Sequence, residues 1–175
     1  MKMKLFWFAL ILLAIWAMKR FYSDAGADNL RWILGPTARL AGATAGVSFV
    51  TEPGTGYLSR ERLFLIEKSC AGLNFMIAAF AMLTFTFRRR VTSFSSGAVV
   101  LGGSVLIAYS AAVIVNAARI TIALWLMDHP LAVSRLTPAQ SHRVEGIIVY
   151  FAGLVLLHEL ILQVQRSGGQ LRSRV

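Results

Sequence analysis

The sequence predicts an all-α fold: a polytopic membrane helix bundle with about four spanning helices plus one interfacial or re-entrant segment. Three observations support this. The chain is 57% hydrophobic and only 15% charged. Its apolar residues form continuous blocks without a period of 3.6 or 2, and a helix that crosses a bilayer needs about 20 such residues. The cations stand at the ends of these blocks, as topology anchors on the cytoplasmic side do: Lys2, Lys4, Arg88, Arg89, Arg90, Arg166, Arg172 and Arg174.

Composition limits the possible chemistry. Cys70 is the single cysteine, which excludes an internal disulfide and a cysteine-based zinc or iron–sulfur site. We therefore expect no metal and no cofactor. The net charge of +10 could indicate a nucleic-acid partner, but its placement indicates contact with the lipid bilayer instead. We expect one membrane domain over residues 1–165 and a basic cytoplasmic tail over 166–175. Nothing in the sequence indicates an oligomeric state.

The first apolar block covers residues 5–18 and follows two lysines, like the core of a signal peptide. No small-residue cleavage site follows it, and Lys19, Arg20, Phe21 and Tyr22 come next. We predict an uncleaved first helix that extends through Tyr22. Lys19 and Arg20 conflict with this prediction, because they would lie near the outer side.

Residues 23–29 form a polar connection, in which Asp28 or Asn29 could cap a following helix. Residues 30–50 include Pro36 and two arginines, and a full span with Arg39 near its middle is costly. We predict an interfacial or re-entrant segment there. Residues 51–68 carry charges of alternating sign and predict a water-exposed loop or a short strand pair.

Three further spans follow. The second runs from near Glu67 to the triple arginine. The third covers residues 98–127 and is interrupted by Asn116 and Arg119, and the fourth covers 144–162. We expect residues 163–175 to be disordered. The positive-inside rule places the triple arginine and both termini in the cytoplasm. Residues 23–68 and 131–141 then lie outside.

This topology brings three chemically unusual residues to one depth. Cys70 lies at the outer end of its helix, Arg119 about 12 Å along the helix from Met127, and His142 at the outer start of the last helix. A helix start favours a thiolate. A cysteine nucleophile needs a base or cation beside it, and an arginine can stabilise the oxyanion. We therefore predict that Cys70, Arg119 and His142 form one catalytic site.

Four more residues support this prediction. Glu67, Cys70 and Asn74 are spaced i, i+3 and i+7 and therefore share one face, Asn116 stands three residues before Arg119, and Glu145 stands three after His142.

Each residue also has a plainer interpretation. Cys70 could be a small buried apolar residue, Arg119 could snorkel to the interface, and His142 could simply face the interface. Of the other histidines, His129 precedes a proline and is expected to be exposed. His158 lies near the inner end of the last helix, beside Glu159 and away from Cys70.

The segments Ser-Cys-Ala-Gly-Leu-Asn (69–74), Asn-Ala-Ala-Arg-Ile (116–120) and Ser-His-Arg-Val-Glu-Gly (141–146) resemble the Cys, Asn-x-x-Arg and His motifs of the exosortase/archaeosortase family. The small size and the run Glu-Lys-Ser-Cys-Ala-Gly-Leu-Asn-Phe resemble the compact bacterial exosortase K branch. The resemblance covers roughly residues 30–151.

This resemblance implies a membrane-embedded cysteine protease and transpeptidase at the outer face of the bacterial cytoplasmic (inner) membrane. Its partner is a membrane-anchored protein with a C-terminal sorting signal. Cys70 then forms a thioester, Arg119 stabilises the oxyanion or thiolate, and His142 shuttles the proton. The chain is shorter than most members and lacks their extra N-terminal spans.

Two functions of other classes compete with this one. The chain could be a non-enzymatic membrane assembly subunit, in which the polar residues only pack helices together. It could also be a thiol-dependent lipid acyl transferase, which carries lipid acyl groups on Cys70. Cys70→Ser would leave the first function intact, and a hydrophobic thioester formed without any sorting-signal protein would favour the second.

Overall fold

A computed structural model describes residues 2–129 and 138–172, of which 2–4, 138–142 and 168–172 are described by backbone alone. Within these residues, four helices are long and apolar enough to cross a membrane. They are α1 (Lys2–Asp24), α3 (Leu73–Phe87, with a short 3-10 turn at each side), α4 (Phe94–Asp128) and α5 (Pro138–Arg172). The prediction of a mostly helical fold with about four helices able to span a membrane is confirmed at this level.

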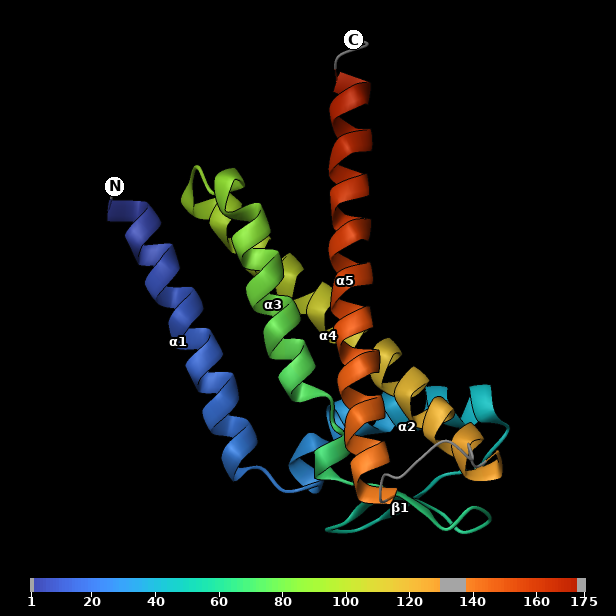
Figure 1. Ribbon diagram of the computed structural model, residues 1–175. Coiled ribbons are helices and arrows are strands. Elements are labelled where there is room, and N and C mark those ends of the chain that lie inside the picture. The colour runs from blue at the N-terminus through green and yellow to red at the C-terminus, as the bar shows by residue number, and fades with distance from the viewer. Residues whose placement is uncertain (1, 130–137, 173–175) are drawn as a thin grey trace.

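The chain ends and the connections between helices gather at two opposite ends of the molecule (Figure 1). The N-terminus, the turn between α3 and α4, and the end of α5 lie toward one end of the molecule, whereas α2 (Arg31–Ala45) and the strands gather at the other. α4 has 35 residues and is therefore about 50 Å long, well beyond the ~30 Å hydrocarbon core. It is inclined relative to α3 and α5, and an inclined helix fits more residues within a bilayer.

The N-terminal helix extends past the two cations, as the sequence analysis predicted. Lys19 Nζ donates a hydrogen bond to Asn74 Oδ1 on α3 at 3.0 Å, and Arg20 pairs with Asp24 at 3.2 Å. Both side chains are solvent-accessible in the structure. These partners explain why the cations are tolerated at this end of α1.

Helix α2 covers most of the segment predicted not to cross the membrane. Its buried residues Ile33, Leu34, Thr37, Ala38 and Ala41 recur at helical spacing, and they pack mainly against α4. Arg39 is exposed on the opposite face. With 15 residues, α2 is too short to span a bilayer.

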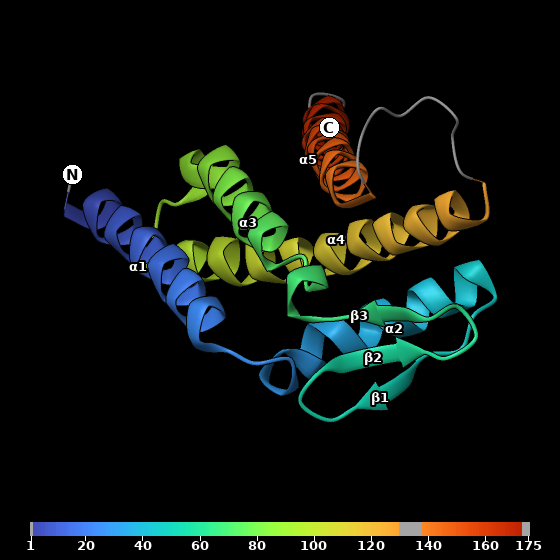
Figure 2. The ribbon, with the colours of Figure 1, turned by 60° about the horizontal axis from the view of Figure 1, so that its bottom comes forward.

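A small antiparallel sheet corrects the all-α prediction. Strands β1 (Val50–Glu52), β2 (Gly56–Ser59) and β3 (Phe64–Ile66) pair in that order, so the segment predicted as a loop or strand pair has three strands. Figure 2 shows the sheet beside α2. Residues of high strand propensity, such as Val50, Tyr57 and Phe64, and short connections between the strands, the first of which contains Gly54, explain the pairing.

Two local predictions are wrong. Asp28 caps no helix: its carboxylate accepts from Arg31 Nη2 at 2.8 Å and from the Gly54 backbone N–H at 3.0 Å. It thereby ties the connection after α1 to the turn between β1 and β2. The segment expected to be disordered from residue 163 is helical to Arg172, because adding residues to an existing helix needs no new nucleus. The predicted boundary at 165/166 lies within this helix.

Candidate functional site

Cys70 lies on a 3-10 turn, η2 (Lys68–Cys70), and not in the first turn of α3. Gly72 follows with φ +67°, in the left-handed region, and α3 begins at Leu73. The predicted position of Cys70 at the start of the helix is therefore wrong, because α3 begins three residues later. The backbone N–H of Cys70 instead donates to the Glu67 carbonyl at 2.9 Å.

This break in the helix also separates Glu67, Cys70 and Asn74, which do not share one helical face. Glu67 accepts a hydrogen bond from Ser69 Oγ at 2.8 Å, and Ser69 Oγ lies 3.8 Å from Cys70 Sγ. Asn74 is exposed and binds Lys19. Glu67 therefore remains beside the thiol through Ser69, whereas Asn74 joins α3 to α1.

The thiol of Cys70 is covered, with 4% of the residue exposed. Tyr22 of α1 donates from its hydroxyl to the Lys68 carbonyl at 3.3 Å. A hydroxyl from another helix thus contacts the turn that carries the thiol.

Asn116 connects α4 to the Cys70 turn. Its side chain is fully buried, and its amide N–H donates to the Cys70 backbone carbonyl. Its Oδ1 accepts a hydrogen bond from the Tyr150 hydroxyl at 2.8 Å. A Cβ at Gly72 would lie only 3.2 Å from Asn116, so glycine there allows both the left-handed turn and the close approach of α4.

Arg119 faces the interior of the bundle with 7% of the residue exposed, which contradicts the snorkelling interpretation. Its Nη1 donates to the Tyr150 hydroxyl at 3.3 Å, and its guanidinium carbon lies 5.4 Å from the centre of the Tyr150 ring. Glu145 of α5 interacts electrostatically with Arg119. Buried charge is expensive unless partners compensate it, and α5 supplies these partners.

The predicted meeting of the Cys70, Arg119 and His142 side chains stays a prediction, because the contact to Cys70 is to its backbone carbonyl. Arg119 and the Cys70 backbone belong to one hydrogen-bonded chain through Tyr150 and Asn116. The side chain of His142 lies outside the described residues. Its backbone belongs to α5, four residues before Gly146, and a Cβ at Gly146 would lie 2.9 Å from Arg119 Nε.

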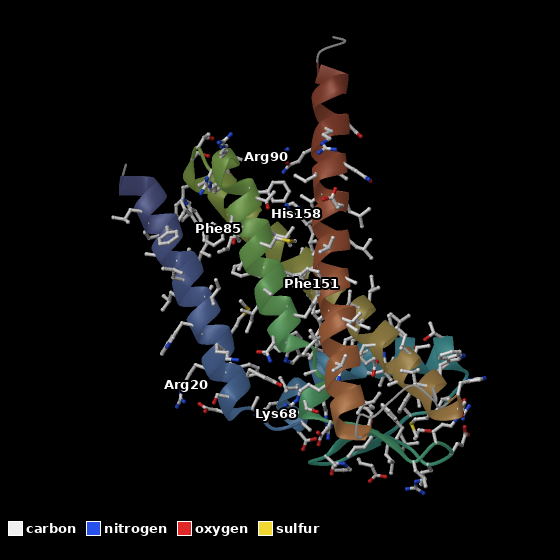
Figure 3. All side chains as sticks on the ribbon, viewed as in Figure 1. Arg20, Lys68, Phe85, Arg90, Phe151 and His158 are labelled. Atoms are coloured by element: carbon white, nitrogen blue, oxygen red, sulfur yellow. The ribbon has the colours of Figure 1, made fainter. Side chains whose placement is uncertain are left out.

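The other two histidines are away from this network. His158 is half-exposed, with Nδ1 3.8 Å from Glu159 Oε1. Figure 3 places it toward the Arg90 end and Lys68, beside Cys70 in sequence, toward the opposite end. His129 is exposed and stacks on Trp125 at 4.7 Å between ring centres.

Sequence reasoning missed Tyr150, although it bridges Arg119 and Asn116. The only available signal was its spacing, since Gly146, Tyr150 and Gly153 recur at i, i+4 and i+7 on one face of α5. A Cβ at Gly153 would lie 2.8 Å from Val115 of α4, so small residues on this face allow close helix packing.

Among the described residues, no group of three or more His, Cys, Asp or Glu side chains could hold a metal ion. Comparison with protein-family models, with curated proteins and with solved structures finds no significant match. The resemblance to exosortases therefore rests on the three sequence motifs, and the structure adds the surroundings of Cys70, Asn116 and Arg119.

Proposed function

We propose that this protein is a membrane-embedded cysteine protease and transpeptidase that processes C-terminal sorting signals at the outer face of the bacterial cytoplasmic membrane. The observation that carries the proposal is the chain of hydrogen bonds from Arg119 through Tyr150 and Asn116 to Cys70. An arginine buried within a candidate span is expensive, and its link to the backbone of the turn that carries the thiol supports a role in thiol chemistry.

In the proposed first step, the Cys70 thiolate attacks the carbonyl carbon of the scissile peptide bond and the carbonyl oxygen becomes negatively charged. Arg119 stabilises this oxygen by charge and N–H donation in a site shielded from water. The C–N bond then breaks, and the leaving amine takes up the proton that His142 relays from the thiol. A thioester on Cys70 remains.

In the second step, a nucleophile with an O–H or N–H group attacks the thioester carbonyl. The C–S bond breaks, the acyl group passes to the nucleophile, and the proton that the nucleophile loses returns through His142 to Cys70. Water as the nucleophile gives proteolysis, and an amine gives transpeptidation. Because Cys70 is covered, a substrate carbonyl reaches Sγ only after a side chain over the thiol moves.

The proposed orientation follows from the distribution of cations. The ends of α3 and α1 that carry Arg88–Arg90 and the first lysines lie together, opposite the Cys70 turn. A single cysteine at Arg60, introduced in a Cys70→Ser background, tests the side because Arg60 is well exposed. Labelling by an impermeant maleimide on intact cells supports the orientation, and labelling only after permeabilisation contradicts it.

One observation favours the competing assembly-subunit function. The contact from Asn116 is to the carbonyl of Cys70 and not to its sulfur, and a covered cysteine is a common packing residue. An assay of a co-expressed substrate with a C-terminal sorting signal separates the two functions. If the protein is a protease, processing should be abolished by each of Cys70→Ala, Cys70→Ser and Arg119→Lys. If it is an assembly subunit, the same substitutions should leave its function intact.

The histidines provide a matched pair in the same assay. His142→Ala should strongly reduce processing, because the proton relay is lost. His158→Ala should have little effect, since His158 lies toward the other end of the molecule. An active His142→Ala beside an inactive His158→Ala would contradict the assignment of His142.

A further inference from the structure

A second candidate site lies at the opposite end of the bundle from Cys70. An open cavity of about 460 Å³ lies between α1, the end of α3 and the start of α4. Phe8, Phe85 and Leu101 line its apolar part, and Arg88 and Arg89 line it from the turn η3 (Arg88–Arg90). Figure 3 places Phe85 and Arg90 toward the end that carries the N-terminus.

Close packing of Trp7 forms one wall of this cavity. Trp7 is 6% exposed, and its indole ring packs so closely against Gly97 that a Cβ there would overlap the ring. Trp7 also contacts Phe94 with 5.5 Å between ring centres, and Phe8 contacts Phe85 at 6.2 Å. Phe8 and Phe85 are both exposed, so their rings line the open side of the cavity.

The charged side chains that line the cavity are all positive. The sequence from residue 70 to residue 127 contains no Asp or Glu, and the only acid in α1 is Asp24 at its far end. Among the described residues, no ion pair involves Arg88 or Arg89, and both are exposed. The mouth of the cavity thus has two guanidinium groups and no carboxylate to neutralise them.

We propose that this cavity binds one anionic phospholipid, with an acyl chain between α1 and α4 and the phosphate on Arg88 and Arg89. Arg88 and Arg89 stand at the end of a candidate span. The end of a span lies at the depth of the lipid phosphates. The apolar walls of the cavity match an acyl chain. Water is excluded from the hydrocarbon core, so an acyl chain is the group available there to fill an apolar cavity. Arginine binds phosphate with paired N–H donors and remains charged. A zwitterionic lipid has the same acyl chain, but its head group carries no net charge to attract the arginines.

Arg90 provides the matched control. It is the third arginine of the same turn, but it lines a different cavity with Phe87 and Ser96, and its guanidinium lies 5.2 Å from the Phe87 ring centre. Arg88→Gln, Arg89→Gln and Arg90→Gln each remove one positive charge. Only the first two remove it from the proposed site.

The test measures binding of phosphatidylglycerol and of phosphatidylcholine with identical acyl chains to the purified full chain, by native mass spectrometry. We expect tight binding of one phosphatidylglycerol and about fivefold weaker binding for Arg88→Gln and for Arg89→Gln, with less than a twofold change for Arg90→Gln. Leu101→Trp, which fills the cavity and keeps every charge, should weaken binding too. Equal binding of the two lipids, or an equal loss in Arg90→Gln, would overturn the proposal.

Discussion

The side-chain amide of Asn116 donates a hydrogen bond to the backbone carbonyl of Cys70, across the contact between α4 and the turn before α3. The two residues are 46 positions apart, and both are buried. The bond fixes the orientation of the Cys70 turn relative to the helix that carries Arg119. The geometry of the thiol therefore depends on α4.

Asn116→Leu tests this dependence. Leucine has a similar size but cannot pair with the Cys70 carbonyl or the Tyr150 hydroxyl, and each buried polar group left without a partner costs about 1–3 kcal/mol. We expect a lower thermal unfolding midpoint in detergent and little or no substrate processing. Asn74→Leu is the control, because Asn74 is exposed and contacts Lys19 instead. Equal stability of Asn116→Leu and the wild type would show that the bond is unimportant.

Gly146→Ala tests the close packing of α5 on Arg119. The added Cβ would lie 2.9 Å from Arg119 Nε, so the guanidinium must shift. We expect processing to fall about tenfold, which corresponds to ~1.4 kcal/mol in the barrier. Gly103→Ala on α4 is the control, because a Cβ there meets no atom within 4 Å. Similar activity of the two variants would contradict the proposed role of Arg119.

Tyr150→Phe removes the hydroxyl that joins Arg119 to Asn116 and keeps the ring that Arg119 faces. We expect a processing rate about tenfold lower at saturating substrate, because the guanidinium loses its fixed position. Tyr109→Phe also removes a bonded hydroxyl, one that donates to the Trp32 carbonyl at 2.9 Å, and should retain full activity. An unchanged rate in Tyr150→Phe would exclude Tyr150 from the site.

The pH dependence of stability should contain a contribution from Asp28. The Gly54 backbone N–H, and next the Arg31 guanidinium, hold the pKa of this carboxyl below its ordinary value. A depressed folded pKa means that the carboxylate stabilises the fold above the unfolded pKa of about 3.9 and loses this effect as pH falls through the folded pKa. Asp28→Asn should therefore unfold more easily than wild type at pH 7, and the difference should disappear in strong acid. A difference that persists below pH 2 would contradict this.

The spans and the inward position of Arg119 were predictable because both follow from the cost of polar groups in hydrocarbon. The break at Cys70 was not predicted. The apolar run favoured a helix from near Glu67, and the left-handed conformation of Gly72 divides it. That conformation depends partly on tertiary packing, since Asn116 of α4 lies close to Gly72.

Tyr150 was missed for a related reason. A tyrosine within an apolar run is consistent with an ordinary packed or interfacial residue, and its bonds to Arg119 and Asn116 come from the packing of α5 on α4. Periodicity indicates which face of a helix is buried, but not which polar groups on different helices meet. The third strand depends similarly on pairing between β2 and β3, which the charge pattern of residues 51–68 does not specify.

The central claim is that Cys70 is a nucleophile that forms a peptide thioester. The most direct measurement is mass spectrometry of the wild-type chain, co-expressed with a sorting-signal substrate and quenched in acid. We expect a substrate-derived peptide attached to Cys70 through a bond that hydroxylamine cleaves, and no such peptide in Cys70→Ala. Processing of the substrate by Cys70→Ala, or a lipid acyl group on Cys70 in cells that lack the substrate, would contradict it.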